Sequence, residues 1–376
     1  MHLNDLPTPQ VLIDQPRLFA NIDRAQQLAT SAGVALRPHA KTHKSPVVAK
    51  WQIEKGAVGI CCAKLGEVEA FVDAGMESVN IRLPYPVNPF NAARLIALMD
   101  RVTLSIIVDH LDVARGWSDE MRRAGRALDV LVKVDVGFHR CGIDPAGDAL
   151  GFLQAVAAMP GLRLRGLLSH AGHGYHAASD DELRSVAARE AETLTALRDR
   201  ATKAGIGLDE MSVGATPTLR FSAGLPGITE LRPGNYVYFD RTQVALGAAT
   251  LDDCALTVLA TVVSKPAADR IILDCGSKTL TNDQARGITK AAGYGAVLVG
   301  DGGSPRRVDE TLTIERLSEE HATVRVTGRT PLQPGDRVRV LPNHSCVVSN
   351  LVDAVRLMED DRVIDTLPVA ARGRIQ

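Results

Sequence analysis

The stretch VALRPHAKTHKSP, residues 34–46, joins a short apolar run to a cluster of basic side chains. A short apolar run bounded by polar or turn residues is typical of a buried strand. Seven comparable runs follow in the first two-thirds of the chain: AVGICCA (57–63), SVNIRL (78–83), TLSIIVD (103–109), DVLVKVDVG (129–137), LRGLLSHA (164–171), EMSVGAT (210–216) and ELRPGNYVYF (230–239). The sequence therefore predicts eight strands in this part of the chain.

Segments with helical periodicity separate these runs. They cover residues 16–33, 66–74, 89–99, 112–124, 145–158 and 181–204, and several begin or end at Gly or Pro. Alternation of strands with amphipathic helices is the pattern of parallel βαβ units, and eight such units form a closed (β/α)8 barrel. We therefore predict an α/β fold with a TIM-type barrel, and a doubly wound open sheet is the alternative.

The pattern changes in the last third of the chain. Here β-branched residues alternate with polar ones in LTVLATVVS (256–264), RIILDC (270–275), AVLVG (296–300), LTIERL (312–317), ATVRVTG (322–328) and DRVRVLP (336–342). Period-two alternation without helical periodicity predicts strands. We therefore expect a barrel at residues 1–247 and an all-β domain at residues 248–376. The opening PTPQVLID (7–14) either lends a strand to the β domain or leads into the barrel.

The charge balance bears on the class of partner. The 376 residues include 43 Lys and Arg against 44 Asp and Glu, which gives a formal net charge of -1. This balance argues against nucleic-acid binding and against attachment to a membrane surface, so we expect a small-molecule substrate. No apolar run approaches the roughly 20 residues that a membrane-spanning helix needs.

Cysteine usage and the N-terminus bear on the compartment. The six cysteines are scattered, without the spacing of a disulfide framework. The N-terminal MHLNDLPTPQ has neither the basic nor the apolar region of a secretion signal. We therefore expect a protein of the reducing cytoplasm.

Polar and small residues follow the predicted strands, and in barrels of this kind such residues form the active site. Lys41 follows the first strand. The seventh and eighth strands are followed by Gly214, Thr216, Gly234 and Asn235. Backbone N–H groups in loops at these two positions commonly hold a phosphate. A lysine facing a phosphate site is what pyridoxal phosphate needs, because the amine forms a Schiff base with the cofactor aldehyde.

Two other interpretations of residues 34–46 stay open. Arg37, His39, His43 and Lys44 accompany Lys41, and such a cluster is also compatible with a solvated basic turn. Lys44 is the other candidate for the cofactor lysine. Because it lies three residues further along, we expect it to lie beyond the strand and to face solvent.

A second candidate site lies in LPNHSCVVSN (341–350), where His344 and Cys346 are two residues apart. In an extended segment both side chains project from the same face. Imidazole and thiolate form a ligand pair suited to zinc, with open positions for water or substrate. A buried cysteine beside a capping histidine is the alternative. His170, His173 and His176 in SHAGHGYH form a weaker metal candidate, because two glycines disfavour a regular helix there.

Seven motifs resemble the D-threonine aldolase and D-serine dehydratase family, relatives of alanine racemase: LRPHAKTHKS (36–45), GICCAKLGEVEAFVDAG (59–75), VKVDVGFHRCGI (132–143), LLSHAGHGY (167–175), VGATPT (213–218), LRPGNYVYFD (231–240) and LPNHSCVVSNL (341–351). The resemblance extends over nearly the whole chain and is most specific in the first and last motifs. It implies a fold-type III pyridoxal phosphate enzyme with a racemase-type barrel and a C-terminal β domain. It also implies a homodimer and a divalent metal beside the cofactor.

The same resemblance implies roles for individual residues. Lys41 in RPHAK corresponds to the Schiff-base lysine of the family. Arg140 in HRCG is similar to a residue close to the cofactor ring, and Tyr175 in HAGHGY to one that contacts the ring or the phosphate. The phosphate loops of the family are matched by Gly214, Thr216, Gly234 and Asn235.

The metal pair of the family is matched by His344 and Cys346, with zinc expected before manganese or magnesium. Family members that cleave carbon–carbon bonds tend to have His-x-Asp there, whereas dehydratases have His-x-Cys. SHAGHGY, VGATPT and YVYFD also resemble the dehydratase branch, whereas GICCAK resembles the aldolase branch. We therefore predict a lyase that converts D-serine, D-threonine or D-3-hydroxyaspartate into a keto acid and ammonia. Cleavage to glycine and an aldehyde is the alternative.

Two other classes of protein fit the sequence less well. An amino-acid racemase needs a second acid or base on the opposite face of its substrate and no metal, so the His-x-Cys pair counts against it. A non-catalytic cofactor carrier with the same barrel would lack the large β domain that this sequence predicts.

Overall fold

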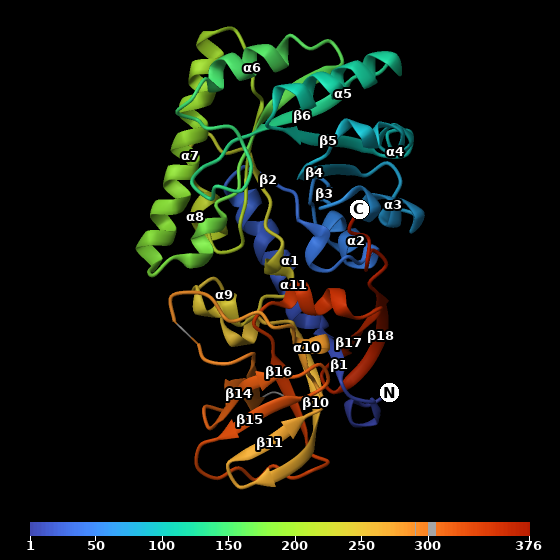
Figure 1. Ribbon diagram of the computed structural model, residues 1–376, viewed down its shortest axis with the longest axis vertical. Coiled ribbons are helices and arrows are strands. Elements are labelled where there is room, and N and C mark those ends of the chain that lie inside the picture. The colour runs from blue at the N-terminus through green and yellow to red at the C-terminus, as the bar shows by residue number, and fades with distance from the viewer. Residues whose placement is uncertain (290, 300–305) are drawn as a thin grey trace.

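The computed structural model describes residues 1–289, 291–299 and 306–376 of the chain. Figure 1 shows two parts, one above the other: a parallel sheet with helices around it, and a separate C-terminal domain that is mostly sheet. The short helices α9 (Arg241–Ala245) and α11 (Ser345–Val348) lie at the junction between the two parts. The predicted combination of a barrel with a β domain is confirmed.

All eight predicted barrel strands are present, although several are shorter than the apolar runs. They are β2 (Ala35–Leu36), β3 (Ile60–Cys61), β4 (Asn80–Pro86), β5 (Thr103–Val108), β6 (Leu128–Lys133), β7 (Leu162–Leu168), β8 (Glu210–Val213) and β9 (Glu230–Leu231). They are parallel, in the order β2-β9-β8-β7-β6-β5-β4-β3. A parallel bridge between His39 and Cys61 joins the continuation of β2 to β3. The sheet therefore closes on itself, and the open-sheet alternative is wrong.

Helices surround these strands. They are α1 (Gln15–Ser31), α2 (Pro46–Glu54), α3 (Leu65–Asp73), α4 (Ala92–Leu98), α5 (Leu111–Arg123), α6 (Ala149–Ala157), α7 (Asp180–Lys203), α8 (Leu219–Ser222) and α9 (Arg241–Ala245). The predicted start of α6 at residue 145 is wrong. Asp148 accepts the N–H of Gly151 and so caps the helix, which begins at Ala149. Within the described residues, we find no helix with the length and apolar character needed to cross a membrane.

The C-terminal domain contains a ten-stranded sheet that includes the N-terminal strand. Its strands are β1 (Gln10–Asp14), β10 (Leu256–Ala267), β11 (Arg270–Leu273), β12 (Ala296–Val299), β13 (Arg307–Val308), β14 (Leu312–Leu317), β15 (Ala322–Val326), β16 (Arg337–Leu341), β17 (Ala354–Glu359) and β18 (Arg362–Pro368). β1 pairs with β10 and β17, so residues 10–14 lend a strand to this sheet. Two short helices accompany the strands, α10 (Ser277–Leu280) and α11 (Ser345–Val348). Gly300, the last residue of the predicted run 296–300, lies outside the described residues.

Buried ion pairs lie inside the barrel near the N-terminal ends of β8 and β9. Nε of Arg37 is 2.7 Å from Oε2 of Glu230, and Arg82 also pairs with Glu230. Nη2 of Arg82 is 2.5 Å from Oε2 of Glu210. Because a buried charge is costly without its partner, these residues hold the strand ends together. The cavity described below lies at the opposite end of the barrel, where the C-terminal ends of the strands are.

Candidate active site

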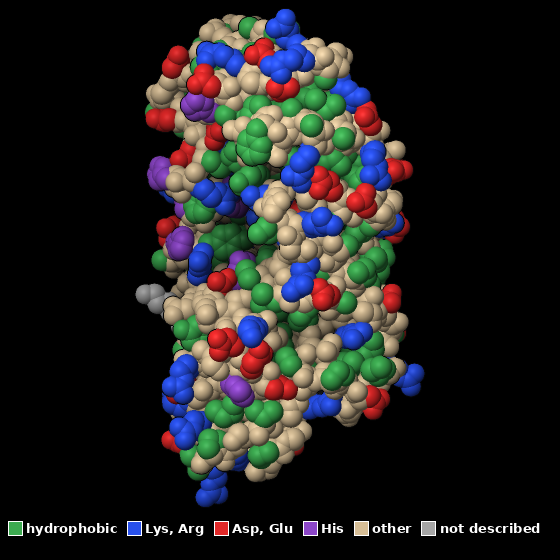
Figure 2. Space-filling view, turned by 45° about the vertical axis from the view of Figure 1, so that its right-hand side comes forward, with side chains coloured by type: hydrophobic (Ala, Val, Ile, Leu, Met, Phe, Trp, Pro, Cys, Tyr) green, Lys and Arg blue, Asp and Glu red, His purple; other side chains and the backbone are tan. Residues whose placement is uncertain are grey.

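A cavity of about 550 Å³ lies where the C-terminal ends of the barrel strands meet α11. Figure 2 shows the surface hollowed at this level, with basic and histidine side chains nearby. Every residue that the family resemblance assigned to the cofactor or the metal lines this cavity: Lys41, Arg140, Tyr175, Gly214, Thr216, Gly234, Asn235, His344 and Cys346. The structure therefore brings both predicted sites together in one place.

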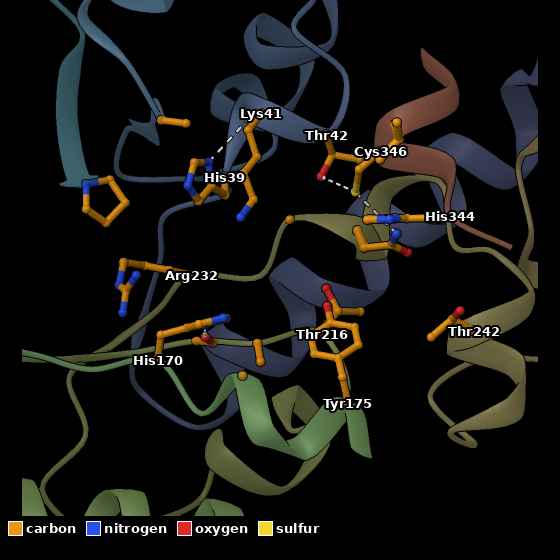
Figure 3. A pocket seen from close by; sticks show the side chains of 18 of the residues that line it. His39, Lys41, Thr42, His170, Tyr175, Thr216, Arg232, Thr242, His344 and Cys346 are labelled. Carbon is orange, nitrogen blue, oxygen red and sulfur yellow. Dashed lines mark hydrogen bonds between the residues drawn. The ribbon is translucent and has the colours of Figure 1, made fainter. Parts of the chain in front are cut away.

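Lys41 lies in a 3-10 turn, η2 (Ala40–Thr42), soon after β2. The ring of His39 accepts the N–H of Lys41 at 3.4 Å and starts this turn. The amine of Lys41 points into the cavity (Figure 3), so its exposed surface faces the cavity. Burial lowers the pKa of Lys41, and the charge of Arg140 acts in the same direction. A lowered pKa makes the neutral amine, which reacts with an aldehyde, more available.

The rest of the basic cluster is buried, so the solvated-turn interpretation is wrong. Arg37, His39, His43 and Lys44 are all less than a tenth exposed. Lys44 has a φ of 47°, and its Nζ lies 3.3 Å from Oε1 of Glu67 in α3. The expectation that Lys44 faces solvent is therefore wrong as well. The ammonium of Lys44 has a carboxylate partner, whereas Lys41 forms no ion pair with any described carboxylate.

Three residues that sequence analysis did not assign to the cofactor site line another wall of the cavity: Lys133 and Arg232, which are buried, and His170, which is half-buried. Nε of Arg232 donates to the hydroxyl of Ser212 at 2.6 Å. Nδ1 of His170 is 2.5 Å from the carbonyl oxygen of Gly214, and burial lowers the pKa of His170. Burial also lowers the pKa of Lys133 to about 7. Each of the three lies at or just after the end of a barrel strand, and this position is the signal that would have found them.

The loops after β8 and β9 offer free backbone donors. The N–H groups of Ala215, Thr216, Gly234 and Asn235 donate no hydrogen bond to any other described residue. Consecutive free N–H groups of this kind bind anions such as phosphate. A Cβ at position 234 would lie 3.0 Å from the hydroxyl oxygen of Thr42, so glycine lets the two loops approach closely. These residues fit the phosphate of pyridoxal phosphate.

The loop after β7 forms the 3-10 helix η4 (Gly172–His176). Tyr175 lines the cavity, and burial raises the pKa of its hydroxyl group. His170 and His176 also line the cavity, whereas His173 does not. No group of three or more His, Cys, Asp or Glu side chains suited to a metal forms within the described residues. The three histidines of this loop therefore do not assemble the metal site considered as an alternative.

His344 and Cys346 meet at the start of α11. The segment is not extended throughout, since only His344 is extended and Cys346 lies in the first helical turn. Their side chains are nevertheless close enough to hydrogen-bond. Burial opposes ionisation of the thiol, but the hydrogen bond and charge of His344 outweigh it, so the pKa of Cys346 is lowered. The thiolate is the form of cysteine that binds metals.

Polar groups surround this pair. The hydroxyl oxygen of Thr42 lies 3.2 Å from Sγ of Cys346, and Nδ2 of Asn235 donates to Sγ at 3.3 Å. Nδ1 of His344 lies 2.6 Å from Oδ2 of Asp283. Imidazole and thiolate form a donor set for zinc, and a two-residue pair leaves further positions to water or substrate. The side chains present therefore fit a divalent metal.

Asp240 fixes the metal pair relative to the barrel. Its Oδ1 accepts the N–H of Gln243 at 3.0 Å and caps α9. Its Oδ2 accepts the N–H of Ser345 at 2.9 Å, in the first turn of α11. One buried carboxylate thus joins the starts of two helices, the first of which follows the last barrel strand.

Comparisons with known proteins agree with this site. Residues 13–242 match the family model of the alanine racemase N-terminal domain, and residues 255–358 match a serine dehydratase domain. The chain is 34% identical over 372 residues to D-threonine aldolase of Arthrobacter sp., covering 97% of this chain and 93% of that protein. It is 33% identical over 377 residues to D-threo-3-hydroxyaspartate dehydratase of Delftia sp. (strain HT23), covering 96% of each.

Solved structures give the same relationship. A metal-free form of D-threo-3-hydroxyaspartate dehydratase, in which a cysteine is replaced by alanine, superposes on the chain with a TM-score of 0.89. The two sequences are 31% identical, and the superposition covers 98% of both chains. The chain therefore belongs to the alanine racemase-like family of lyases that includes D-threonine aldolase and D-threo-3-hydroxyaspartate dehydratase.

Proposed function

We propose that the chain is a metal-dependent pyridoxal phosphate lyase that dehydrates D-3-hydroxy amino acids and releases a keto acid and ammonia. The observation that carries this proposal is the single cavity shared by Lys41, the free N–H groups of the two glycine loops and the His344–Cys346 pair. The similarity to a hydroxyaspartate dehydratase over 96% of each chain supports it.

Pyridoxal phosphate would be held by Lys41 and by the loops that follow β8 and β9. When bound, this cofactor withdraws electrons from the bonds at Cα of an amino acid. Arg140 and Tyr175 line the same cavity and are placed to contact it. The guanidinium of Arg232 donates a hydrogen bond to Ser212, which fixes its positive charge at the wall of the cavity.

Lys41 is the residue that we expect to take the proton from Cα. Desolvation inside the cavity lowers its pKa, so its amine is neutral over a wider range of pH than that of a lysine in bulk water. The turn η2, closed by His39, holds the side chain toward the cavity. Lys41 thus combines a position facing the cavity with a lowered pKa, and both favour its use as a general base.

His344 and Cys346 would hold the metal, with zinc preferred over manganese or magnesium. A divalent metal polarises a hydroxyl group and stabilises it as it leaves. Thr42, which follows Lys41 directly, contacts Cys346 at 3.2 Å. The base for the proton on Cα and the site for the hydroxyl on Cβ are therefore neighbours, as elimination of water requires. Water then completes the reaction by releasing ammonia from the unsaturated product.

Retro-aldol cleavage to glycine and an aldehyde is the second candidate, because the chain is 34% identical to a D-threonine aldolase. The GICCAK motif (59–64) resembles that branch; its Cys61 and Cys62 are fully buried away from the cavity, whereas its Ala63 and Lys64 line the cavity. Cys346, which resembles the dehydratase branch, also lines it. Cys346 would bind the metal itself and so bears more directly on the reaction than Ala63 and Lys64, which is why dehydration is favoured.

A product assay separates the two reactions. The protein, loaded with pyridoxal phosphate and zinc or manganese, is incubated with D-serine, D-threonine and D-threo-3-hydroxyaspartate. We expect a keto acid and one equivalent of ammonia from at least one substrate, without glycine. Glycine and an aldehyde would establish the aldolase alternative, and inversion at Cα with an intact carbon skeleton would establish a racemase.

A further inference from the structure

We propose that Asp283 is a positioning residue of the metal site, whose carboxylate orients the imidazole of His344 so that its second nitrogen faces Cys346. This inference rests on the proposed metal-dependent function. Asp283 comes from a separate loop and acts on the predicted metal pair, His344 and Cys346, through its contact with His344.

The contact between the two side chains is short and directional. Oδ2 of Asp283 lies 2.6 Å from Nδ1 of His344, within the range of a charge-assisted hydrogen bond. Because Nδ1 is used in this way, Nε2 is the nitrogen left for a metal that His344 would share with Cys346, which lines the same cavity. A histidine that binds a metal usually donates its other N–H to a carboxylate or carbonyl, which fixes the ring and strengthens the ligand.

The loop that carries Asp283 is itself fixed beside the metal pair. Nδ2 of Asn343 donates to the carbonyl oxygen of Asp283 at 2.9 Å, and Asn343 is buried. The N–H of Asp283 donates to the hydroxyl of Thr281 at 3.1 Å. Thr281 has a φ of 64°, which β-branched residues rarely adopt and which persists only where the surroundings enforce it. The backbone of Asp283 is therefore held through both its carbonyl oxygen and its N–H group.

A buried carboxylate nearby, Asp240, is already engaged. Its two oxygens accept hydrogen bonds from Gln243, Ser345 and Asn235. Within the described ranges, Asp283 is the only carboxylate whose oxygen hydrogen-bonds to the ring of His344. By engaging Nδ1 of His344, Asp283 leaves Nε2 as the ring nitrogen that is available to a metal.

Zinc affinity tests this role without relying on turnover. The cofactor-loaded protein is titrated with zinc in competition with a chromogenic chelator, as wild type and as Asp283→Ala, Asp283→Asn and Asn282→Ala. Loss of an outer partner of a metal ligand typically weakens binding about 10- to 100-fold. We expect such a rise in Kd for Asp283→Ala and a smaller rise for Asp283→Asn, which keeps an acceptor oxygen but loses the charge. Asn282→Ala changes an exposed neighbour in the same loop and should leave the Kd unchanged.

Proton NMR of the zinc-loaded protein gives an independent readout. We expect a slowly exchanging, downfield proton on Nδ1 of His344 that disappears in Asp283→Ala. If Asp283→Ala does not fold, Asp283→Asn decides the matter by the same Kd measurement. A Kd within about threefold of wild type for every folded Asp283 variant, while His344→Ala loses zinc, would overturn this inference alone. Unchanged zinc binding in His344→Ala and Cys346→Ala would instead remove the proposed metal site, and the inference with it.

Discussion

The hydroxyl oxygen of Thr42 and the thiol sulfur of Cys346 lie 3.2 Å apart, although 304 positions separate the two residues in the chain. Thr42 directly follows Lys41 in the first barrel loop, and Cys346 lies in the first turn of α11. Ser349 strengthens the same junction, because its hydroxyl donates to the carbonyl oxygen of Thr42 at 2.5 Å. The distance between the cofactor lysine and the metal pair is therefore set by direct contacts between the barrel and the β domain.

Replacing Thr42 by valine tests this junction. Thr42→Val keeps the shape of the side chain but removes the group that contacts Sγ. We expect kcat/KM with a D-3-hydroxy amino acid to fall about tenfold, as for other outer partners of metal ligands. Thr42→Ser restores the hydroxyl and should recover most of the activity. Equal activity of the valine variant and wild type would show that the contact has no part in the reaction.

Replacing either residue of the metal pair, His344 or Cys346, should change both metal content and turnover. His344→Ala and Cys346→Ala should each lose the tightly bound metal and lower turnover roughly a hundredfold or more, because the leaving hydroxyl loses its stabilisation. Both variants should keep the visible absorbance of the lysine-bound cofactor. Metal analysis and a spectrum of each purified protein provide the measurements. Cys275→Ala alters a buried thiol in the same domain and should retain the metal; full metal content in Cys346→Ala would contradict the assignment.

Periodicity predicted the barrel because strands of a closed parallel barrel are buried on both faces and appear as continuous apolar runs. β6 within DVLVKVDVG is an example. The lengths of β2 and β9 were overestimated, since each ends two residues before a proline, Pro38 or Pro233, that has no N–H for the ladder. The order of the strands, and hence which loops face one another, followed from the barrel rule.

The candidate site could be predicted where it depends on the ends of strands. Lys41 and the glycines of two loops were found in this way. The helical turn at Cys346 could not be predicted, because its first residue, Ser345, is held by Asp240, 105 positions before Ser345. The contact of Asp283 with His344 spans 61 positions and lies in a segment without periodicity. Tertiary contacts of this kind leave no local pattern in the sequence.

The lowered pKa of Lys133 should make the free energy of unfolding depend on pH in a specific way. Burial lowers its pKa from 10.5 to about 7 in the folded protein. Between these values the unfolded chain binds a proton that the folded protein does not, so the contribution of Lys133 to the free energy of unfolding rises with pH. Lys133→Met removes this contribution.

Denaturant unfolding of the cofactor-free proteins at pH 7 and pH 9 measures the effect. The free energy of unfolding of wild type, relative to Lys133→Met, should increase by roughly 2 kcal/mol between these two conditions, since one pKa unit corresponds to about 1.4 kcal/mol. A difference that stays constant with pH would mean that Lys133 keeps an ordinary pKa in the folded protein.

The covalent attachment of the cofactor tests the central claim most directly. The protein loaded with pyridoxal phosphate is reduced with borohydride, digested and analysed by mass spectrometry. The account predicts a phosphopyridoxyl group on the peptide that contains Lys41, and on Lys41 itself when the fragments are sequenced. Attachment to Lys44 or Lys133, or no attachment to any lysine of the cavity, would contradict it.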